Sequence, residues 1–348
     1  MIQRSAFLTL LVLSAACNGG STIGSLAPPQ SLQLSASSCL TSTCIYALAG
    51  SFWNSEIAIF ADNARGNVRP LAVIGGKKTE MGRIGQGVAV DENHVVYATD
   101  AADDAVRVYA AGSYGNVKPA YSIDGSQTDL NVPQALAIDD DNNLYVANSD
   151  GGSNDPSITV YAAGAKGNAA PIQIISGPST GLMNPSGVAV DSSHDVYVAN
   201  PGNSDGGTVT VYAAHANGDE APIQTISGPN TQLSVPTGIA VDSSKNIYVS
   251  NTTGRYGRGF YGRITVYAAG SNGNVAPIQT ISGDETKLSY PWGLALNSSR
   301  DIYVAAGAPS TVLVFAAGAN GNVKPMQTIK GRKTTFGKLS EGWSIAIR

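Results

Sequence analysis

Hydrophobic and polar positions alternate in short runs along most of the chain, and beyond the N-terminus no stretch has apolar residues at helical spacing. One unit of about 50 residues contains four such runs, for example 187–191, 196–200, 208–212 and 222–226. Each run is rich in Val, Ile, Thr and Tyr and is bounded by Gly, Asn, Asp, Ser or Pro, which is typical of β-strands. We name the four predicted strands of a unit a, b, c and d.

The unit occurs six times. A proline that we expect to open strand d follows the aromatic marker of strand c at one fixed distance, whereas the step from b to c varies and takes nearly all of the insertions. Units of four strands and this length are typical of propeller blades. The sequence therefore predicts an all-β six-bladed β-propeller with four antiparallel strands per blade. The aromatic markers of strand c are Phe60, Tyr109, Tyr161, Tyr212, Tyr267 and Phe315.

The phase of the repeat predicts how the ring closes. The chain enters the repeat at a strand b, over residues 44–49, and ends on a lone strand a, over residues 342–347. We therefore expect the C-terminal strand to complete the N-terminal blade. Such closure removes the open sheet edges that promote aggregation.

The pattern Pro-x-Gly-(Val/Ile)-Ala-Val-Asp, followed after four residues by (Val/Ile)-Tyr-Val-(Ala/Ser)-Asn, stands at 185–200 and 236–251. It resembles the NHL repeat of six-bladed propellers with the TolB-like shape, and the resemblance covers roughly residues 40–348. The resemblance implies the fold but no single activity, because one scaffold hosts many activities. Some propellers of this kind are lyases with histidine-bound zinc, and others are lactonases whose divalent metal is held by acidic and Asn groups at the ring mouth.

Residues 1–17 have the features of an export signal, with an apolar run over 6–13 and small residues directly before Cys17. They resemble a bacterial lipoprotein signal, in which Cys17 becomes the lipidated first residue, although Ser14 departs from the leucine that this signal prefers. Plain secretion with cleavage nearby stays open. We therefore expect an exported protein that is lipid-anchored at the bacterial cell envelope, or else periplasmic or extracellular, and that contacts the membrane through the anchor only.

Residues 18–38 are rich in Gly, Ser and Pro and are predicted to form a flexible tether, so the propeller spans 39–348. Cys39 and Cys44 are an even pair in an exported chain, which suggests a disulfide; two free thiols are the alternative.

We expect a monomer. Charged residues make up only 13% of the chain, and the net charge is −4 without a basic run, so nucleic acid is not an expected partner.

The histidines argue against a zinc enzyme of the lyase type. His94 and His194 occupy one repeat position in the a–b turn, where other copies carry Asn142, Lys245 and Arg300. We interpret that position as a solvated turn. No nucleophile motif with a convergent base is present in the sequence.

Aspartates at the end of strand a, namely Asp91, Asp139, Asp191 and Asp242, are predicted to cap the a–b turn by accepting backbone N–H groups. Acidic residues in the b–c loops are more typical of solvated turns, although five on one rim can hold Ca²⁺. We therefore expect no cofactor, with Ca²⁺ as the alternative. These loop residues are Asp103, Asp104, Asp150, Asp155 and Asp205.

The b–c and d–a connections must share one face because blade strands alternate in direction, and insertions on one face commonly mark the binding side. The longest b–c loop, 251–263, combines Arg and aromatic residues with Gly, as contact surfaces do. The candidate contact residues are Arg255, Tyr256, Arg258, Phe260, Tyr261 and Arg263, with Trp53 in a connection on the same face. The sequence favours a binding or interaction module for a protein or glycan ligand of the envelope over an enzyme. The alternatives are a metal-dependent hydrolase, lactonase or lyase of the propeller type, and a structural envelope role.

Overall fold

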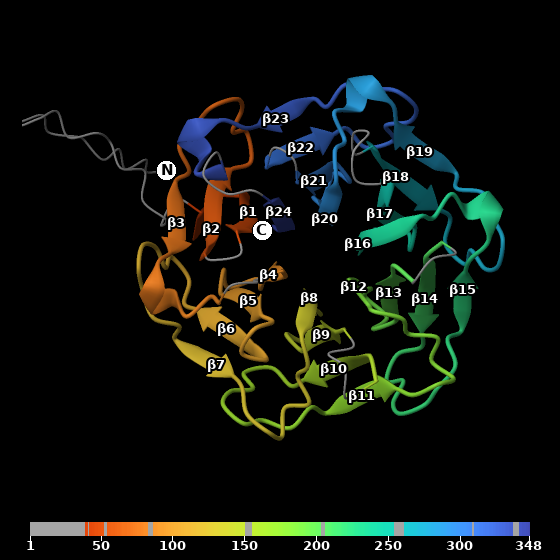
Figure 1. Cartoon of the computed structure of the whole chain (residues 1–348), viewed down its shortest axis with the longest axis horizontal. Helices are drawn as coiled ribbons and strands as arrows, with labels where there is room; N and C mark the ends of the chain where they lie inside the picture. The colour runs from red at the N-terminus through yellow and green to blue at the C-terminus, as the bar shows by residue number, and fades with distance from the viewer. Residues whose placement is uncertain are drawn as a thin grey trace, which may run out of the picture. The chain divides into compact units, whose positions relative to one another are not determined.

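The short runs of β-formers separated by turn residues form antiparallel strands in the computed structural model. The structure describes residues 39–40, 42–51, 54–82, 86–149, 155–202, 206–253, 261–307, 310–336 and 341–348. The described residues form six four-stranded antiparallel sheets, arranged as blades around a central axis (Figure 1). The predicted all-β six-bladed propeller is confirmed.

In each blade the first strand, a, lies nearest the axis and the fourth, d, lies at the perimeter (Figure 1). The a strands are β4 (Val88–Val90), β8 (Pro133–Ile138), β12 (Gly187–Val190), β16 (Val235–Val241), β20 (Pro291–Leu296) and β24 (Glu341–Ile347). The b strands are β1 (Cys44–Ser51), β5 (Val96–Asp100), β9 (Leu144–Asn148), β13 (Val196–Asn200), β17 (Ile247–Thr253) and β21 (Ile302–Ala306).

The c strands are β2 (Asn54–Ala61), β6 (Ala105–Tyr109), β10 (Ser157–Tyr161), β14 (Thr208–Tyr212), β18 (Tyr261–Tyr267) and β22 (Thr311–Phe315). The d strands are β3 (Ala72–Gly75), β7 (Tyr121–Ile123), β11 (Gln173–Ser176), β15 (Gln224–Ile226), β19 (Gln279–Ser282) and β23 (Gln327–Ile329). Short 3-10 turns follow four of the d strands: η2 (Lys77–Thr79), η3 (Pro229–Thr231), η4 (Asp284–Thr286) and η5 (Arg332–Thr334). The described residues include no helix long and apolar enough to cross a membrane.

The ring closes as predicted, through pairing of its first and last strands. Strand β24 pairs antiparallel with β1, with Tyr46 opposite Ala346, so the last strand completes the first blade. Two backbone hydrogen bonds between Cys44 and Arg348 extend this pairing. Because β1 lies between β24 and β2, the b strand of the first blade has no open edge.

The prolines do not open the outer strands, contrary to our prediction. Strand β15, for example, begins at Gln224, two residues after Pro222. The residue between them, Ile223, donates its N–H to the carbonyl oxygen of Val211 at 2.8 Å. Because proline has no N–H to give to the ladder, pairing starts with the following residue and the proline stays in the c–d connection.

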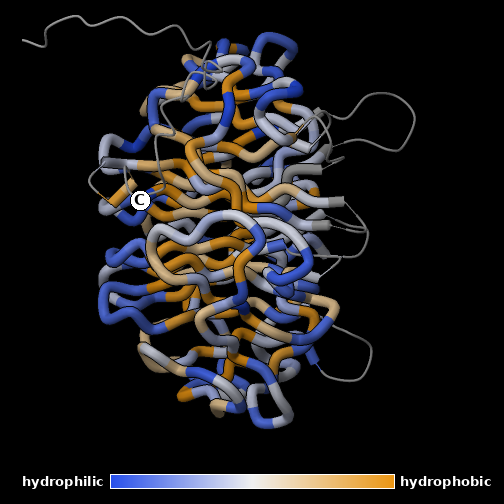
Figure 2. Tube along the Cα trace, turned by 90° about the vertical axis from the view of Figure 1, so that its left-hand side faces the viewer, coloured by the Kyte–Doolittle hydropathy of each residue, from blue (hydrophilic) through white to orange (hydrophobic). Residues whose placement is uncertain are grey.

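The core consists of apolar layers between adjacent blades, and the turns at both faces are hydrophilic (Figure 2). The aromatic marker of strand c lies in these layers and is fully buried. Where it is a tyrosine, its hydroxyl also anchors the d–a connection, as Tyr212 does by donating to the carbonyl oxygen of Thr180 at 2.7 Å. The marker is therefore a core residue with one satisfied polar atom.

A clamp at the perimeter joins each blade to the preceding one, and we did not predict it from the sequence. In blade five, Gly273 bridges to Ile226 of the preceding blade, and the side-chain oxygen of Asn274 accepts the N–H of Asn230 at 2.8 Å. Gly228 has φ 110°, and a Cβ there would meet the Asn274 side chain at 2.7 Å. The residues that accept in this way around the ring are Asn67, Asn116, Asn168, Asp219, Asn274 and Asn322.

Candidate functional site

The propeller presents two chemically different faces. Because neighbouring strands run antiparallel, the b–c and d–a connections lie on one face, which we call the b–c face, and the a–b and c–d connections lie on the other, the a–b face. The axis opens on the b–c face into a cavity of 380 Å³, which we call the mouth. The mouth is lined by Gln86, Gln134, Ser149, Asn184, Ser186, Pro201, Val235, Thr237 and Trp292.

One position of the repeat supplies most of the mouth. This position directly precedes the small residue, Gly or Ala, near the start of strand a. In five blades it is occupied by Gln86, Gln134, Ser186, Thr237 and Trp292. The following position is small because the inner strands approach closely; a Cβ at Gly238 would overlap the carbonyl oxygen of Trp292. The repeat alignment carried a signal for this site, because the position varies between copies while its neighbours hardly change.

The polar groups of the mouth are neutral. The Gln134 amide nitrogen donates to the Ser149 hydroxyl at 3.1 Å and to the Val132 carbonyl at 3.2 Å. The Ser186 hydroxyl donates to the Pro236 carbonyl at 3.0 Å, and that of Thr237 donates to the Pro291 carbonyl at 2.7 Å. Among the described lining residues none carries a charge, so the mouth offers amide and hydroxyl groups beside an indole ring.

The rim of the mouth is conformationally strained. Val132, Asn184 and Tyr290 each lie two positions before a mouth residue and have φ values of 47°, 52° and 53°. A left-handed conformation is an outlier for a β-branched residue such as Val132. The Tyr290 ring lies 5.8 Å from the Trp292 ring, which helps to fix the indole.

A metal held by carboxylates does not fit the described lining of the mouth, which contains no Asp or Glu. The acidic residues of the neighbouring b–c loop are engaged elsewhere. Asp103 pairs with Arg107 at 3.0 Å, and Asp104 accepts the N–H of Val132 at 2.7 Å. Of the other residues considered for Ca²⁺, Asp155 is exposed, and Asp150 and Asp205 lie outside the described residues.

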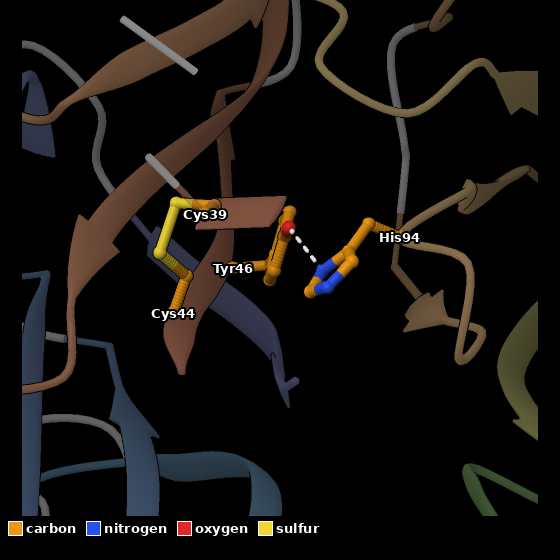
Figure 3. Close-up of a disulfide and its surroundings, with 4 residues drawn as sticks. All are labelled: Cys39, Cys44, Tyr46 and His94. Atoms are coloured by element: carbon orange, nitrogen blue, oxygen red, sulfur yellow. Dashed lines mark hydrogen bonds between the residues drawn. A yellow bond between two sulfur atoms is a disulfide. The ribbon is translucent and has the colours of Figure 1, made fainter. Parts of the chain in front are cut away.

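Cys39 and Cys44 form the predicted disulfide. The sulfurs of Cys39 and Cys44 lie 2.03 Å apart, at the start of β1 (Figure 3). On the same strand, the Tyr46 hydroxyl lies 3.5 Å from Nδ1 of His94 in the next blade. The disulfide therefore holds Cys39 against the start of β1, and the Tyr46–His94 contact joins the first two blades.

The predicted contact loop is shorter than expected. Pairing of β17 with β18 continues outward to Thr253 and Tyr261, so only residues 254–260 connect the strands. Arg263 belongs to β18 and is partly buried, opposite Asn251. Extended pairing was not visible in the sequence because the loop is rich in Gly. The candidates Arg255, Tyr256, Arg258 and Phe260 lie outside the described residues, as do Trp53 and Cys17.

The strand-end aspartates are turn caps, as predicted. Oδ1 of Asp191 accepts the N–H groups of Ser193 and Asp195 at 2.8 and 3.0 Å, and Oδ2 accepts the hydroxyl proton of Tyr197 at 2.9 Å. Nζ of Lys245 in the next blade lies 2.9 Å from the same Oδ2. Burial opposes ionisation, but the hydrogen bonds from Lys245 and Tyr197 hold the pKa of Asp191 below its usual value.

The position that we interpreted as a solvated turn is partly exposed and also contacts the preceding blade. Lys245 contacts Asp191, and Nη1 of Arg300 lies 3.9 Å from Oδ2 of Asp242, in each case in the preceding blade. His194 likewise reaches the preceding blade, and its side chain is only 28% exposed. The inter-blade contact was not predicted, because the a–b turn is remote in sequence from the blade against which it packs.

Residues 37–237, more than half of the chain, match the family described as SMP-30/gluconolactonase/LRE-like region. Among solved structures, a Bacteroides caccae protein of unknown function aligns at 11% identity over 88% of this chain and 99% of its own, with a TM-score of 0.60. A candidate 6-phosphogluconolactonase from Bacteroides fragilis aligns at 14% identity over 88% of this chain and 98% of its own, with a TM-score of 0.52. Hydrazine synthase of Kuenenia stuttgartiensis aligns at 14% identity over 77% and 75%, with a TM-score of 0.54. At identities of 11–14%, the similarity to these solved structures shows a shared fold and nothing more. No curated protein matches the chain.

Proposed function

The chain belongs to the SMP-30/gluconolactonase/LRE-like family of six-bladed propellers, and on that basis we propose that it is a binding module whose mouth holds an uncharged saccharide. The observation that carries the proposal is the neutral lining of the mouth, where Gln86 and Gln134 stand beside Trp292. Amides exchange hydrogen bonds with sugar hydroxyls, and an indole packs against the apolar face of a sugar ring. A volume of 380 Å³ lies within the range of small-molecule sites, about 300–1,000 Å³.

The surrounding b–c face extends the contact surface. The blade-five hairpin pairs as far as Thr253 and Tyr261, two residues further than the hairpin of blade four. We propose that residues 254–260 contact the part of a longer glycan, or of a protein that carries it, beyond the mouth. A rigid ring with NHL-like repeats would hold the loops in place without ordering costs on binding.

The test is a binding assay with neutral oligosaccharides of glucose, mannose, galactose and N-acetylglucosamine, followed by calorimetry on each binder. Trp292→Ala and Gln134→Ala should each weaken binding at least tenfold, because each removes a direct contact at the mouth. Tyr114→Ala is the matched control: Tyr114 is an exposed aromatic residue in a c–d connection, on the a–b face. Unchanged affinity in both mouth variants, or equal loss in the control, would rule out the mouth as the site.

We further propose that the protein is exported and anchored through Cys17. The disulfide between Cys39 and Cys44 supports an oxidising compartment, because such bonds are rare in reducing ones. Wild type and Cys17→Ser are to be compared by metabolic labelling with an alkyne fatty acid and by membrane fractionation. Label and membrane association should both be lost in Cys17→Ser. Equal labelling of the two proteins would exclude the anchor.

Metal-dependent lactone hydrolysis is the second candidate function, and the family membership favours it. Such an enzyme requires metal ligands at the mouth, and the side-chain amide of Asn184, which lines the mouth, is a candidate ligand. Hydrolysis of gluconolactone and homoserine lactones is to be measured with Ca²⁺, Mn²⁺ or Zn²⁺ and after chelation. Turnover that disappears on chelation and in Asn184→Ala would establish the hydrolase. No turnover with any ion would exclude lactone hydrolysis at the mouth.

A further inference from the structure

A second chemically distinct site lies on the a–b face, between blades three and four. Among the described residues, one group of histidine and carboxylate side chains brings its ligand atoms within 4.8 Å of one another, namely Asp139, Asp141 and His194. From these atoms we propose that the chain binds one divalent transition-metal ion of the Zn²⁺ class here, as a clasp between two blades.

The distances suit a tetrahedral ion. Nε2 of His194 lies 3.3 Å from Oδ2 of Asp141 and 3.7 Å from Oδ2 of Asp139. With bonds of about 2.1 Å, two ligand atoms on a tetrahedral Zn²⁺ lie about 3.4 Å apart. An imidazole and two carboxylates therefore stand near the spacing that the ion requires. The ring of His215, from a c–d connection, lies 6.2 Å from that of His194, so a second imidazole stands beside the site.

The carboxylate of Asp139 is held in place from behind. Its Oδ1 accepts the N–H groups of Asp141 and Asn143, and its Oδ2 accepts from the Asn143 amide at 2.9 Å and the Tyr145 hydroxyl at 3.1 Å. Outer partners of this kind fix ligands and raise metal affinity. The side chain of Asp139 is 1% exposed and that of Asp141 is 72% exposed, so the site has one rigid ligand and one open to solvent.

At the next two junctions between blades, the residue equivalent to His194 is positively charged. At the same repeat position Lys245 lies 2.9 and 3.0 Å from two carboxylate oxygens of Asp191 and Asp195, and Arg300 faces Asp242. In the junction between blades three and four the side chain is an imidazole, which binds metals when neutral. A divalent cation there would supply the charge that lysine and arginine supply at the next two junctions.

The experiment uses the full chain without affinity-tag histidines. Chelator-treated protein is titrated with Zn²⁺ by calorimetry and with Co²⁺ by visible absorption, which reports tetrahedral coordination. We expect one equivalent of each ion to bind and the melting temperature to rise with Zn²⁺. His194→Lys copies the charge of Lys245, so it should fold, melt independently of Zn²⁺ and bind the ion at least tenfold more weakly.

His94→Ala is the matched control, because His94 has the same turn position but faces the Tyr46 hydroxyl. It should bind Zn²⁺ as the wild type does. Unchanged Zn²⁺ affinity in His194→Lys, or the absence of stoichiometric binding in the wild type, would overturn the proposal. Saccharide affinity at the mouth is measured on the same variants, and it should be unaffected, so failure of either proposal is recognised separately.

Discussion

The side-chain oxygen of Asn67 accepts a hydrogen bond from the backbone N–H of Lys333 at 2.8 Å, although 266 positions separate the two residues. The contact joins the first blade to the last at the perimeter, while β24 joins β1 near the axis. The ring is therefore closed twice, by strand pairing on the inside and by a side-chain clamp on the outside. The same clamp joins the other neighbouring blades, so closure uses the ordinary blade contact.

Deleting residues 341–348 should prevent the ring from closing. The deletion removes β24, leaves β1 with an unpaired edge and uncovers apolar residues such as Ile45. Open edges of this kind promote aggregation, so we expect loss of soluble protein and of cooperative thermal unfolding. Moving the eight residues to a position before Cys39 through a Gly-Ser linker should restore both. A truncated protein that stays soluble with an unchanged melting temperature would contradict the closure.

The perimeter clamp predicts a ranking of small destabilisations. Asn67→Ala should lower the free energy of unfolding by about 1 kcal/mol, as loss of one hydrogen bond does. Gly331→Ala should cost about 1–3 kcal/mol, because φ is 121° and the new Cβ would meet the Asn67 side chain at 2.6 Å. Gly318→Ala, at a positive φ in open space, is the control and should cost less than Gly331→Ala. Urea denaturation measures all three, and the reverse order for the two glycines would argue against the clamp.

Arg107 and Asp100 form an ion pair in blade two, with Nη2 and Oδ2 3.2 Å apart. Three other blades have a threonine at the position of Arg107 and an asparagine at the position of Asp100, and these two residues form a hydrogen bond, as Asn148 and Thr159 do. Arg107→Thr should lower the free energy of unfolding by about 3–5 kcal/mol, because it leaves the buried Asp100 carboxylate without its cation. Adding Asp100→Asn should recover most of the loss, since the pair then matches the other blades. Chemical denaturation of the single and double variants checks this, and equal instability of the two would refute it.

The pH dependence of the Arg107→Thr variant follows from Asp100. Burial raises the pKa of Asp100 above the usual 3.8, and the Arg107 guanidinium opposes that rise. Without Arg107 the native pKa should rise further. A carboxyl with a raised native pKa penalises the fold when it is ionised, so the deficit should be largest above the native pKa and shrink as the pH falls toward 3.8. A deficit that grows on acidification would contradict this assignment.

Buried tyrosines predict a steep loss of stability at alkaline pH. Burial raises the pKa of Tyr46, Tyr212 and Tyr267 from 10.0 to about 12. The unfolded chain then loses protons above pH 10 that the native chain retains, so stability falls between pH 10 and 12 by about 1.4 kcal/mol per pH unit for each tyrosine. Urea denaturation across this range, with absorbance at 295 nm to follow ionisation, measures the slope. Tyr212→Phe should reduce the slope by one tyrosine; an unchanged slope would show that Tyr212 does not contribute.

The sequence by itself determined the fold. The alternation of β-formers with turn residues, repeated in six copies, fixed the blade, and the lone strand at 342–347 fixed the way the ring closes. It also gave the role of the strand-end aspartates, because a turn cap such as Asp191 contacts backbone only two and four residues away. These are local features, or features of one repeating unit, and a periodic sequence displays them directly.

Only the tertiary structure decided which residues meet across blades. The mouth gathers residues from several copies of the repeat, with equivalent positions about 50 residues apart, and Gln86 and Trp292 approach only because the ring closes. His194 meets Asp139 because consecutive blades pack against each other, and Asn67 meets Lys333 because the last blade packs against the first. A repeat states what each blade contains, but the rotation between blades sets which side chains converge. That rotation arises from packing of the apolar layers between neighbouring sheets, and it cannot be read from any one copy of the repeat.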